Sequence, residues 1–156
     1  MRSGVPVGLS FTGLDADPAG VLRTGHAVDD VPVAGGRYTA TMLVAGAPAA
    51  LFDAADLGLT GTEDNDAIAD RMDLLVALRQ KASLLMGLSR FGEPISHAIP
   101  KVGVVGPPRN YRTSAGTEVC ADEYDISVRM VSMLAPHPAI GLTSAVAVAA
   151  ASTIPR

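Results

Sequence analysis

The stretch that decides the fold is AIGLTSAVAVAAASTI, residues 139–154. It carries no charged side chain and consists mostly of alanine and valine with some serine and threonine. At about 16 residues it is shorter than the ~20 that a membrane-spanning helix needs. An apolar helix of this length is typical of a protein interior. We therefore predict a buried helix here, surrounded by sheet, and no membrane segment.

The segment just before this helix predicts a strand over residues 125–133. Ile126, Val128 and Met130 alternate with residues that point to the other face, the two-residue period of a strand. Further strands are predicted over residues 38–44, 49–52 and 101–105, where β-branched or apolar side chains are bounded by glycine and proline.

A longer amphipathic helix is predicted over residues 66–86, where apolar side chains recur at steps of three and four. Acidic residues gather at its start and basic residues such as Arg79 lie near its end, which is the order that the helix dipole favours. Asp64 or Asn65 can cap its first turn, and Gly87 can end it. The helix should be half exposed, with its charged face toward solvent. The order strand, strand, helix, strand, strand, helix indicates an α+β or mixed α/β fold.

Composition excludes several classes of function. The 156 residues fit one domain, with 48% hydrophobic and 18% charged residues and a net charge of −4. The acidic balance argues against nucleic acid and membrane surfaces as partners. A single cysteine excludes a disulfide framework and a multi-cysteine zinc site. The first residues lack the apolar run of a signal peptide, so we expect a cytoplasmic protein.

The residue types that most often carry catalysis are scattered. His26, His97 and His137 are far apart and have no ligand spacing, so we expect no metal site. Acidic residues surround Cys120, whereas a reactive cysteine needs positively charged neighbours, which favours an ordinary loop cysteine over a catalytic one. No phosphate-binding glycine loop and no nucleophile elbow occur.

One segment combines features of an anion site. A strand ends, a histidine follows, and a helix begins with small and hydroxyl residues, so that unpaired N–H groups at the helix start suit a carboxylate. The candidate substrate-binding residues are Ser132, Met133, His137, Gly141, Thr143 and Ser144. The alternatives are that Thr143 and Ser144 only pack internally, or that an anion binds instead around residues 109–112.

Short motifs follow one another along nearly the whole chain. They are LRTGHAVD (22–29), ADLGLTGTE (55–63), Leu78-Arg79-x-x-Ala82, MGL (86–88), PKV (100–102), ISVRMVSM (126–133), His137 and TSA (143–145). Together they resemble the PrpF family of isomerases, which act on unsaturated di- and tricarboxylates and include aconitate isomerase-like, methylitaconate isomerase and oxalomesaconate tautomerase proteins.

This resemblance implies a two-domain protein with the diaminopimelate epimerase-like fold, in which each domain wraps a mixed sheet around a central helix. It also implies a small carboxylate substrate, held in the cleft between the domains near helix N-termini. The reaction moves a proton across an allylic system without a cofactor, as a base removes the proton and an acid returns it.

The sequence departs from the family in its length. The family's proposed catalytic cysteine and lysine belong to a first domain with no counterpart here, because Cys120 lies in a different segment and Lys101 matches a different lysine. We therefore expect residues 1–36 to be a junction after a missing first domain and residues 37–156 to be most of the second.

Two possible functions follow from the resemblance, and we assign no catalytic residue for either of them. The chain is an isomerase or tautomerase sequence that is inactive as an isolated piece and needs a missing first domain or a second chain. Alternatively it is a truncated, non-catalytic relative that binds an anion or associates with another chain. An unrelated interaction domain is the third possibility.

Overall fold

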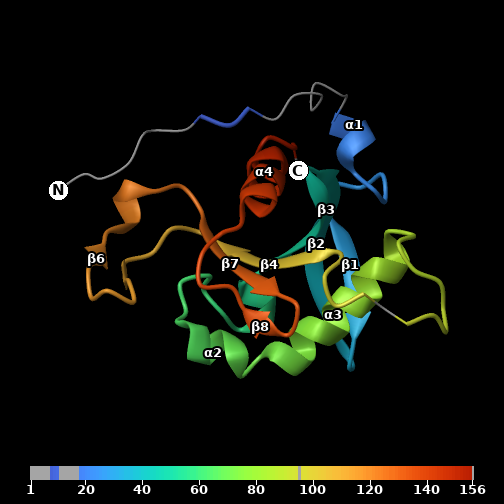
Figure 1. Cartoon of the computed structure of the whole chain (residues 1–156), viewed down its shortest axis with the longest axis horizontal. Helices are drawn as coiled ribbons and strands as arrows, with labels where there is room; N and C mark the ends of the chain where they lie inside the picture. The colour runs from blue at the N-terminus through green and yellow to red at the C-terminus, as the bar shows by residue number, and fades with distance from the viewer. Residues whose placement is uncertain (1–7, 11–17, 95, 156) are drawn as a thin grey trace.

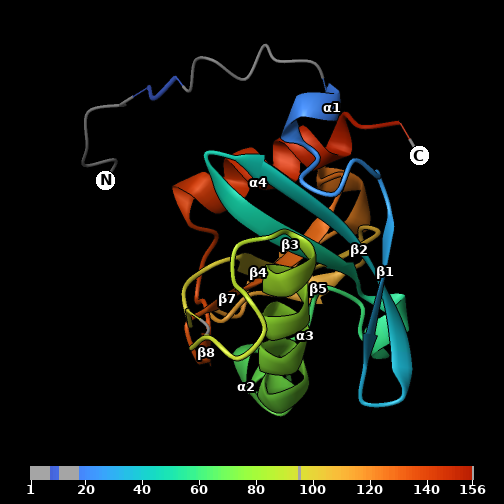
Figure 2. The same ribbon diagram turned by 90° about the vertical axis from the view of Figure 1, so that its right-hand side faces the viewer.

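A six-stranded sheet forms the centre of the computed structural model, which describes residues 8–10, 18–94 and 96–155. The strands follow the order β1-β2-β3-β4-β7-β8, and β5 and β6 form a separate pair. Helix α3 lies on one face of the sheet and α4 on the other (Figures 1 and 2). The expected mixed α/β architecture is therefore observed.

The sheet is mixed because β3 and β4 run parallel, while the other neighbouring strands run antiparallel. Its strands are β1 (Asp29–Val33), β2 (Gly36–Ala45), β3 (Ala47–Asp53), β4 (Lys101–Gly106), β7 (Ser127–Ser132) and β8 (Ala135–Pro136). The small pair consists of β5 (Tyr111–Arg112) and β6 (Glu118–Val119). The helices are α1 (Pro18–Val21), α2 (Asn65–Ala69), α3 (Met72–Leu85) and α4 (Leu142–Ser152), with short 3-10 turns at Ala55–Leu57 and Ala121–Glu123.

Alternation along the strands builds one apolar layer on each face of the sheet. Met42 and Phe52 pack toward α3, in a cluster with Leu75 and Leu78 of that helix. The intervening residues of β2 and β3 pack toward α4. The alternation predicted for residues 125–133 is confirmed, since Val131 joins the α3 layer while Val128 and Met130 join the α4 layer.

The predicted helix 66–86 forms as two helices, α2 and α3, with a turn at Asp70 and Arg71. The apolar period continues across this turn, which is why the sequence predicts a single helix. The predicted N-terminal cap is confirmed: Asp64 Oδ1 accepts a 2.8 Å hydrogen bond from the amide of Ala67 at the start of α2. Gly87 follows α3 with a left-handed φ of 66°.

Helix α4 differs from its prediction. The sheet covers only one of its faces, which presents Ser144, Ala147 and Val148 to β2 and β3, while Ala149 is exposed and Val146 partly exposed. Among the residues described here, the sheet therefore covers one side of the helix, which is less enclosed than expected. A helix without charges tolerates burial on every side but does not require it, because exposed alanine costs little.

Part of the predicted junction joins the main sheet. Residues 29–33 form β1 and pair with β2, and Leu22 bridges to Leu43. Ala34 and Gly35, with φ angles of 51° and 79°, form the turn of the β1–β2 hairpin. Among the described residues, no helix has the length and apolar character that crossing a bilayer requires.

Candidate functional site

The end of β7 carries a tight turn that forms one side of the predicted site. Ser132 pairs with Ala135 of β8, and Met133 between them has a left-handed φ of 52°. That conformation costs a residue with a side chain about 1–2 kcal/mol. The chain then returns along β7, where the amide of His137 donates a 2.8 Å hydrogen bond to the Met130 carbonyl.

A buried arginine from α3 supports this turn. One nitrogen of Arg79, Nη1, donates to the carbonyl of His97 at 2.6 Å and to the carbonyl of Met133. The residue is 2% exposed, and its burial lowers the pKa of the guanidinium. None of the ion pairs among the described residues involves Arg79, and its Nε is buried without a hydrogen-bond partner.

His137 connects the turn to the helix that follows. Its Nδ1 accepts a 3.2 Å hydrogen bond from the amide of Ala139. In the neutral imidazole the other nitrogen, Nε2, then carries the proton and acts as a donor. The side chain is half-buried, and its ring is held by Ala139, two residues before the N-cap of α4.

The N-terminus of α4 has no side-chain cap. Gly141 is the N-cap residue, with extended backbone angles, and its carbonyl accepts from the amide of Ala145. Within the described chain, no hydrogen bond engages the amides of Leu142, Thr143 and Ser144. These amides point along the helix axis and carry the positive end of the helix dipole, which suits an anion.

The structure divides the six predicted residues into two groups. Gly141, Thr143 and Ser144 lie together at the start of α4, whereas Ser132 and Met133 lie at the β7–β8 turn that Arg79 reaches from the other face of the sheet. His137 lies between the two groups along the chain. The side chain of Ser144 faces the sheet with 6% exposure, so it packs internally, as one of the alternatives held.

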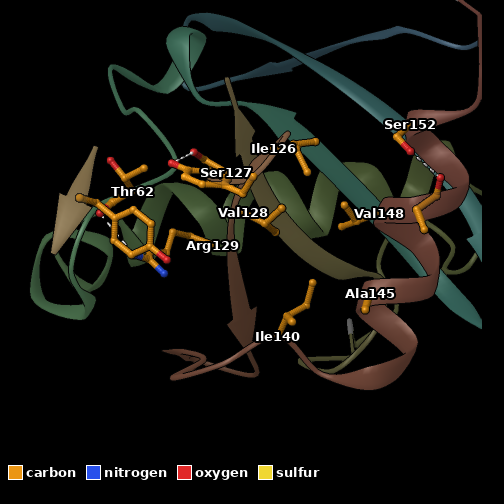
Figure 3. Close-up of a pocket in the computed structure, with 13 residues that line it drawn as sticks. Thr62, Ile126, Ser127, Val128, Arg129, Ile140, Ala145, Val148 and Ser152 are labelled. Atoms are coloured by element: carbon orange, nitrogen blue, oxygen red, sulfur yellow. Dashed lines mark hydrogen bonds between the residues drawn. The ribbon is translucent and has the colours of Figure 1, made fainter. Parts of the chain in front are cut away.

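A cavity of about 530 Å³ lies beside this segment, between β7 and α4 (Figure 3). Ile126, Val128 and Val148 contribute apolar wall, and Thr62, Ser127 and Arg129 contribute polar groups. None of the six predicted residues lines it.

Arg129 in this cavity is held by main-chain oxygens. Its Nε donates to the carbonyl of Glu63 at 2.5 Å and its Nη2 to the carbonyl of Thr62 at 3.3 Å. The guanidinium carbon lies 5.8 Å from the centre of the Tyr111 ring. A lone arginine inside an apolar strand is a signal that the sequence offers for this residue.

The Glu63 carboxylate organises the loop beside the cavity. It accepts hydrogen bonds from the amide and hydroxyl of Thr60, at 2.6 and 2.7 Å, and from the amide of Gly61 at 2.9 Å. Burial raises the pKa of this carboxyl, but the hydrogen bonds outweigh burial and hold the pKa below its ordinary value of 4.5. Glu63 is therefore ionised at neutral pH and acts as a structural anion.

The remaining candidates stay apart from this segment. Cys120 is exposed, and its amide donates to the Glu123 carboxylate at 2.6 Å. The side chain of His26 lies near Asp29, at 3.5 Å. In the part of the chain that the structure describes, no three histidine, cysteine or acidic residues gather in a group that could hold a metal ion.

The family model described as PrpF protein matches residues 1–156. The chain belongs to the PrpF family. It is 39% identical over 147 residues to the 2-methyl-aconitate isomerase of Shewanella oneidensis, covering 90% of this chain and 37% of that protein. It is 33% identical over 138 residues to the (4E)-oxalomesaconate Delta-isomerase of Novosphingobium sp., covering 86% of this chain and 33% of that protein.

A solved structure of methylitaconate-delta-isomerase has the same fold. The TM-score is 0.77 at 28% sequence identity, over 86% of this chain and 37% of the solved one. This PrpF chain thus spans little more than a third of the length of the relatives it matches. The sequence-based assignment to the family is confirmed.

Proposed function

We propose that this PrpF chain holds the substrate carboxylate in an isomerase that shifts a proton across the allylic system of an unsaturated di- or tricarboxylate. The observation that supports it is the uncapped start of α4, next in the chain to His137 and the end of β7. The relatives are named as isomerases of acids of this kind, and a carboxylate is the ligand that free helix amides favour.

In this proposal the amides of Leu142, Thr143 and Ser144 bind a carboxylate oxygen, and His137 donates through Nε2. A helix N-terminus contributes roughly 0.3–1 kcal/mol to an exposed anion and up to ~2 kcal/mol to a partly buried one. The same amides stabilise the enolate-like charge that develops when a proton leaves the carbon beside the carboxylate. Proton transfer of this type needs no cofactor.

We further propose that the groups which move the proton belong to a first domain outside these 156 residues. Residues 37–156 would then be most of the second domain of a diaminopimelate epimerase-like fold, and residues 1–36 the segment that leads into it. The tautomerase activity and the cytoplasmic location expected from the sequence belong to this same proposal.

The alternative is a non-catalytic relative that associates with another chain. The exposed apolar residues around α4 favour it, since Leu142 is 51% exposed and Ile140 46% exposed. Apolar side chains grouped in this way are typical of surfaces that bind a partner. Association with another chain requires no bound carboxylate, which separates this form of the alternative from the first proposal.

Amide chemical shifts during a citrate titration test the carboxylate site. We expect shifts centred on residues 137–144, with a Kd in the millimolar range or weaker, roughly −4 kcal/mol. His137→Ala should weaken these shifts, whereas the matched variant His26→Ala, at a side chain that is 73% exposed, should leave them unchanged. Shifts confined to residues 109–112 would place the anion on the other surface and contradict the proposal.

A further inference from the structure

Arg79 occupies a position that an apolar residue would normally fill. Along α3 the inward positions Leu75, Leu78, Ala82 and Ser83 are buried, and Arg79 is buried among them at 2% exposure. Its spacing of four from Leu75 and three from Ala82 is that of the apolar face itself. A methionine would occupy a similar volume without a charge to desolvate.

Its hydrogen bonds join two segments that are remote in sequence. The carbonyl of His97 lies 18 residues away and that of Met133 lies 54 residues away. Met133 holds a left-handed backbone conformation, which its side chain disfavours. A fixed donor on the carbonyl of Met133 offsets part of that cost and keeps the β7–β8 turn in one shape.

The charge of Arg79 has no acidic partner among the described residues, and its Nε lacks any hydrogen-bond acceptor. Main-chain carbonyls solvate a guanidinium only in part, so the buried charge leaves a positive potential at this end of the sheet. The chain runs from Met133 through only three residues to His137, which begins the approach to α4. An anion bound along this approach is therefore favoured.

We infer that Arg79 is a positioning residue of the carboxylate site: it fixes the Met133 turn, and through that turn the segment that carries His137 to the start of α4. The inference rests on the proposed function, from which the carboxylate ligand is taken. Arg79 itself does not touch the ligand.

The experiment compares citrate binding by the whole chain and three arginine variants, read from amide shifts. Arg79→Gln removes the charge and should raise the citrate Kd about tenfold or more, because hydrogen bonds to a charged group are among the stronger ones. Arg79→Lys keeps the charge and should recover binding in part. Arg90→Gln removes a charge from an exposed side chain and should bind like the parent chain.

A second substitution separates positioning from simple support of the core. Glycine adopts a left-handed φ without steric cost, so Met133→Gly added to Arg79→Gln should restore part of the citrate binding. A residue that only filled space in the core would gain nothing from that change. If Arg79→Gln does not fold, the comparison is made between Arg79→Lys and its Met133→Gly double variant.

The outcomes distinguish this inference from the proposed function. A folded Arg79→Gln variant that binds citrate like the parent overturns the role of Arg79 and leaves the carboxylate site in place. If the parent chain shows no citrate shifts at 137–144, the proposed function fails. In that case the role of Arg79 is still tested by the amide signals of Met133 and His97 in Arg79→Gln. Altered signals support positioning of the β7–β8 turn, and unaltered signals overturn it.

Discussion

At the scale of single residues, Gly106 controls how the end of β4 meets the loop that precedes α2. A Cβ atom added there would lie 2.4 Å from the carbonyl oxygen of Thr60. Overpacking of this kind costs about 1–3 kcal/mol, so Gly106→Ala should lower the free energy of unfolding by that amount. Urea denaturation measures it, with Gly8→Ala as the control because its added Cβ meets nothing within 4 Å. Equal urea midpoints for the two variants would mean that the Thr60 loop moves away from the added Cβ atom without a cost in stability.

Glu63 gives a prediction about pH at the same scale. Its pKa in the folded chain is held below 4.5, so ionised Glu63 stabilises the fold above that value, and the contribution is lost as pH falls through the lower, folded pKa. Glu63→Gln should therefore be less stable than the parent at pH 7, and the difference should shrink as the pH falls below 4.5. Urea midpoints across this range measure it. A difference that stays constant with pH would show that the carboxylate charge contributes nothing.

At the scale of elements, α3 presents one face to the core and one to water. Leu78 is fully buried, whereas Leu85 is 42% exposed. Leu78→Ala should cost about 2–5 kcal/mol of unfolding free energy, and Leu85→Ala about 1 kcal/mol or less. Both substitutions keep helix propensity almost unchanged, so the pair isolates burial. Similar losses at both positions would contradict the amphipathic packing of this helix.

Element boundaries also mark the limit of what the sequence predicts. Residues 38–44, 49–52 and 101–105 have clear strand patterns and lie on strands of the main sheet, and residues 125–133 contain β7 (Ser127–Ser132). Strand β1 escaped prediction because Asp29-Asp30-Val31-Pro32-Val33 has acidic residues and a proline where strands favour β-branched side chains. Its structure comes from pairing with β2, which no local pattern reports. The exposure of α4 likewise depends on which elements surround it.

At the scale of the whole molecule, we expect no measurable isomerase turnover by this chain alone. Each positioned acid or base contributes about 10²–10⁴-fold to such reactions, and we propose that those groups belong to the first domain. Exchange of aconitate protons with deuterated water, followed by NMR, measures the rate. Solvent exchange at enzymatic rates by a homogeneous preparation would contradict this, and Cys120, Lys101 and His137 would then be the side chains to substitute.

Only those parts of the candidate site that depend on local sequence patterns could be predicted from the sequence. The helix start at Gly141 and the neighbouring His137 follow from residue types and spacing. The sequence predicts Arg79 as a basic residue near a helix end, whereas the structure buries it beneath a turn that lies 54 residues away in sequence. That contact depends on the packing of α3 against the sheet. An arginine on the apolar spacing of a helix was the one available sign.

The parallel pairing of β3 with β4 has a consequence for how the chain folds. Strands β1, β2 and β3 follow one another through short turns, so their contacts close small loops and should form early. The next pair joins Ala49–Asp53 to Lys101–Val105 across the whole α2–α3 segment, which costs more chain entropy before any contact stabilises it. Strand β7 and the residues around His137 depend on β4, so the part of the molecule that we propose binds the carboxylate is assembled last.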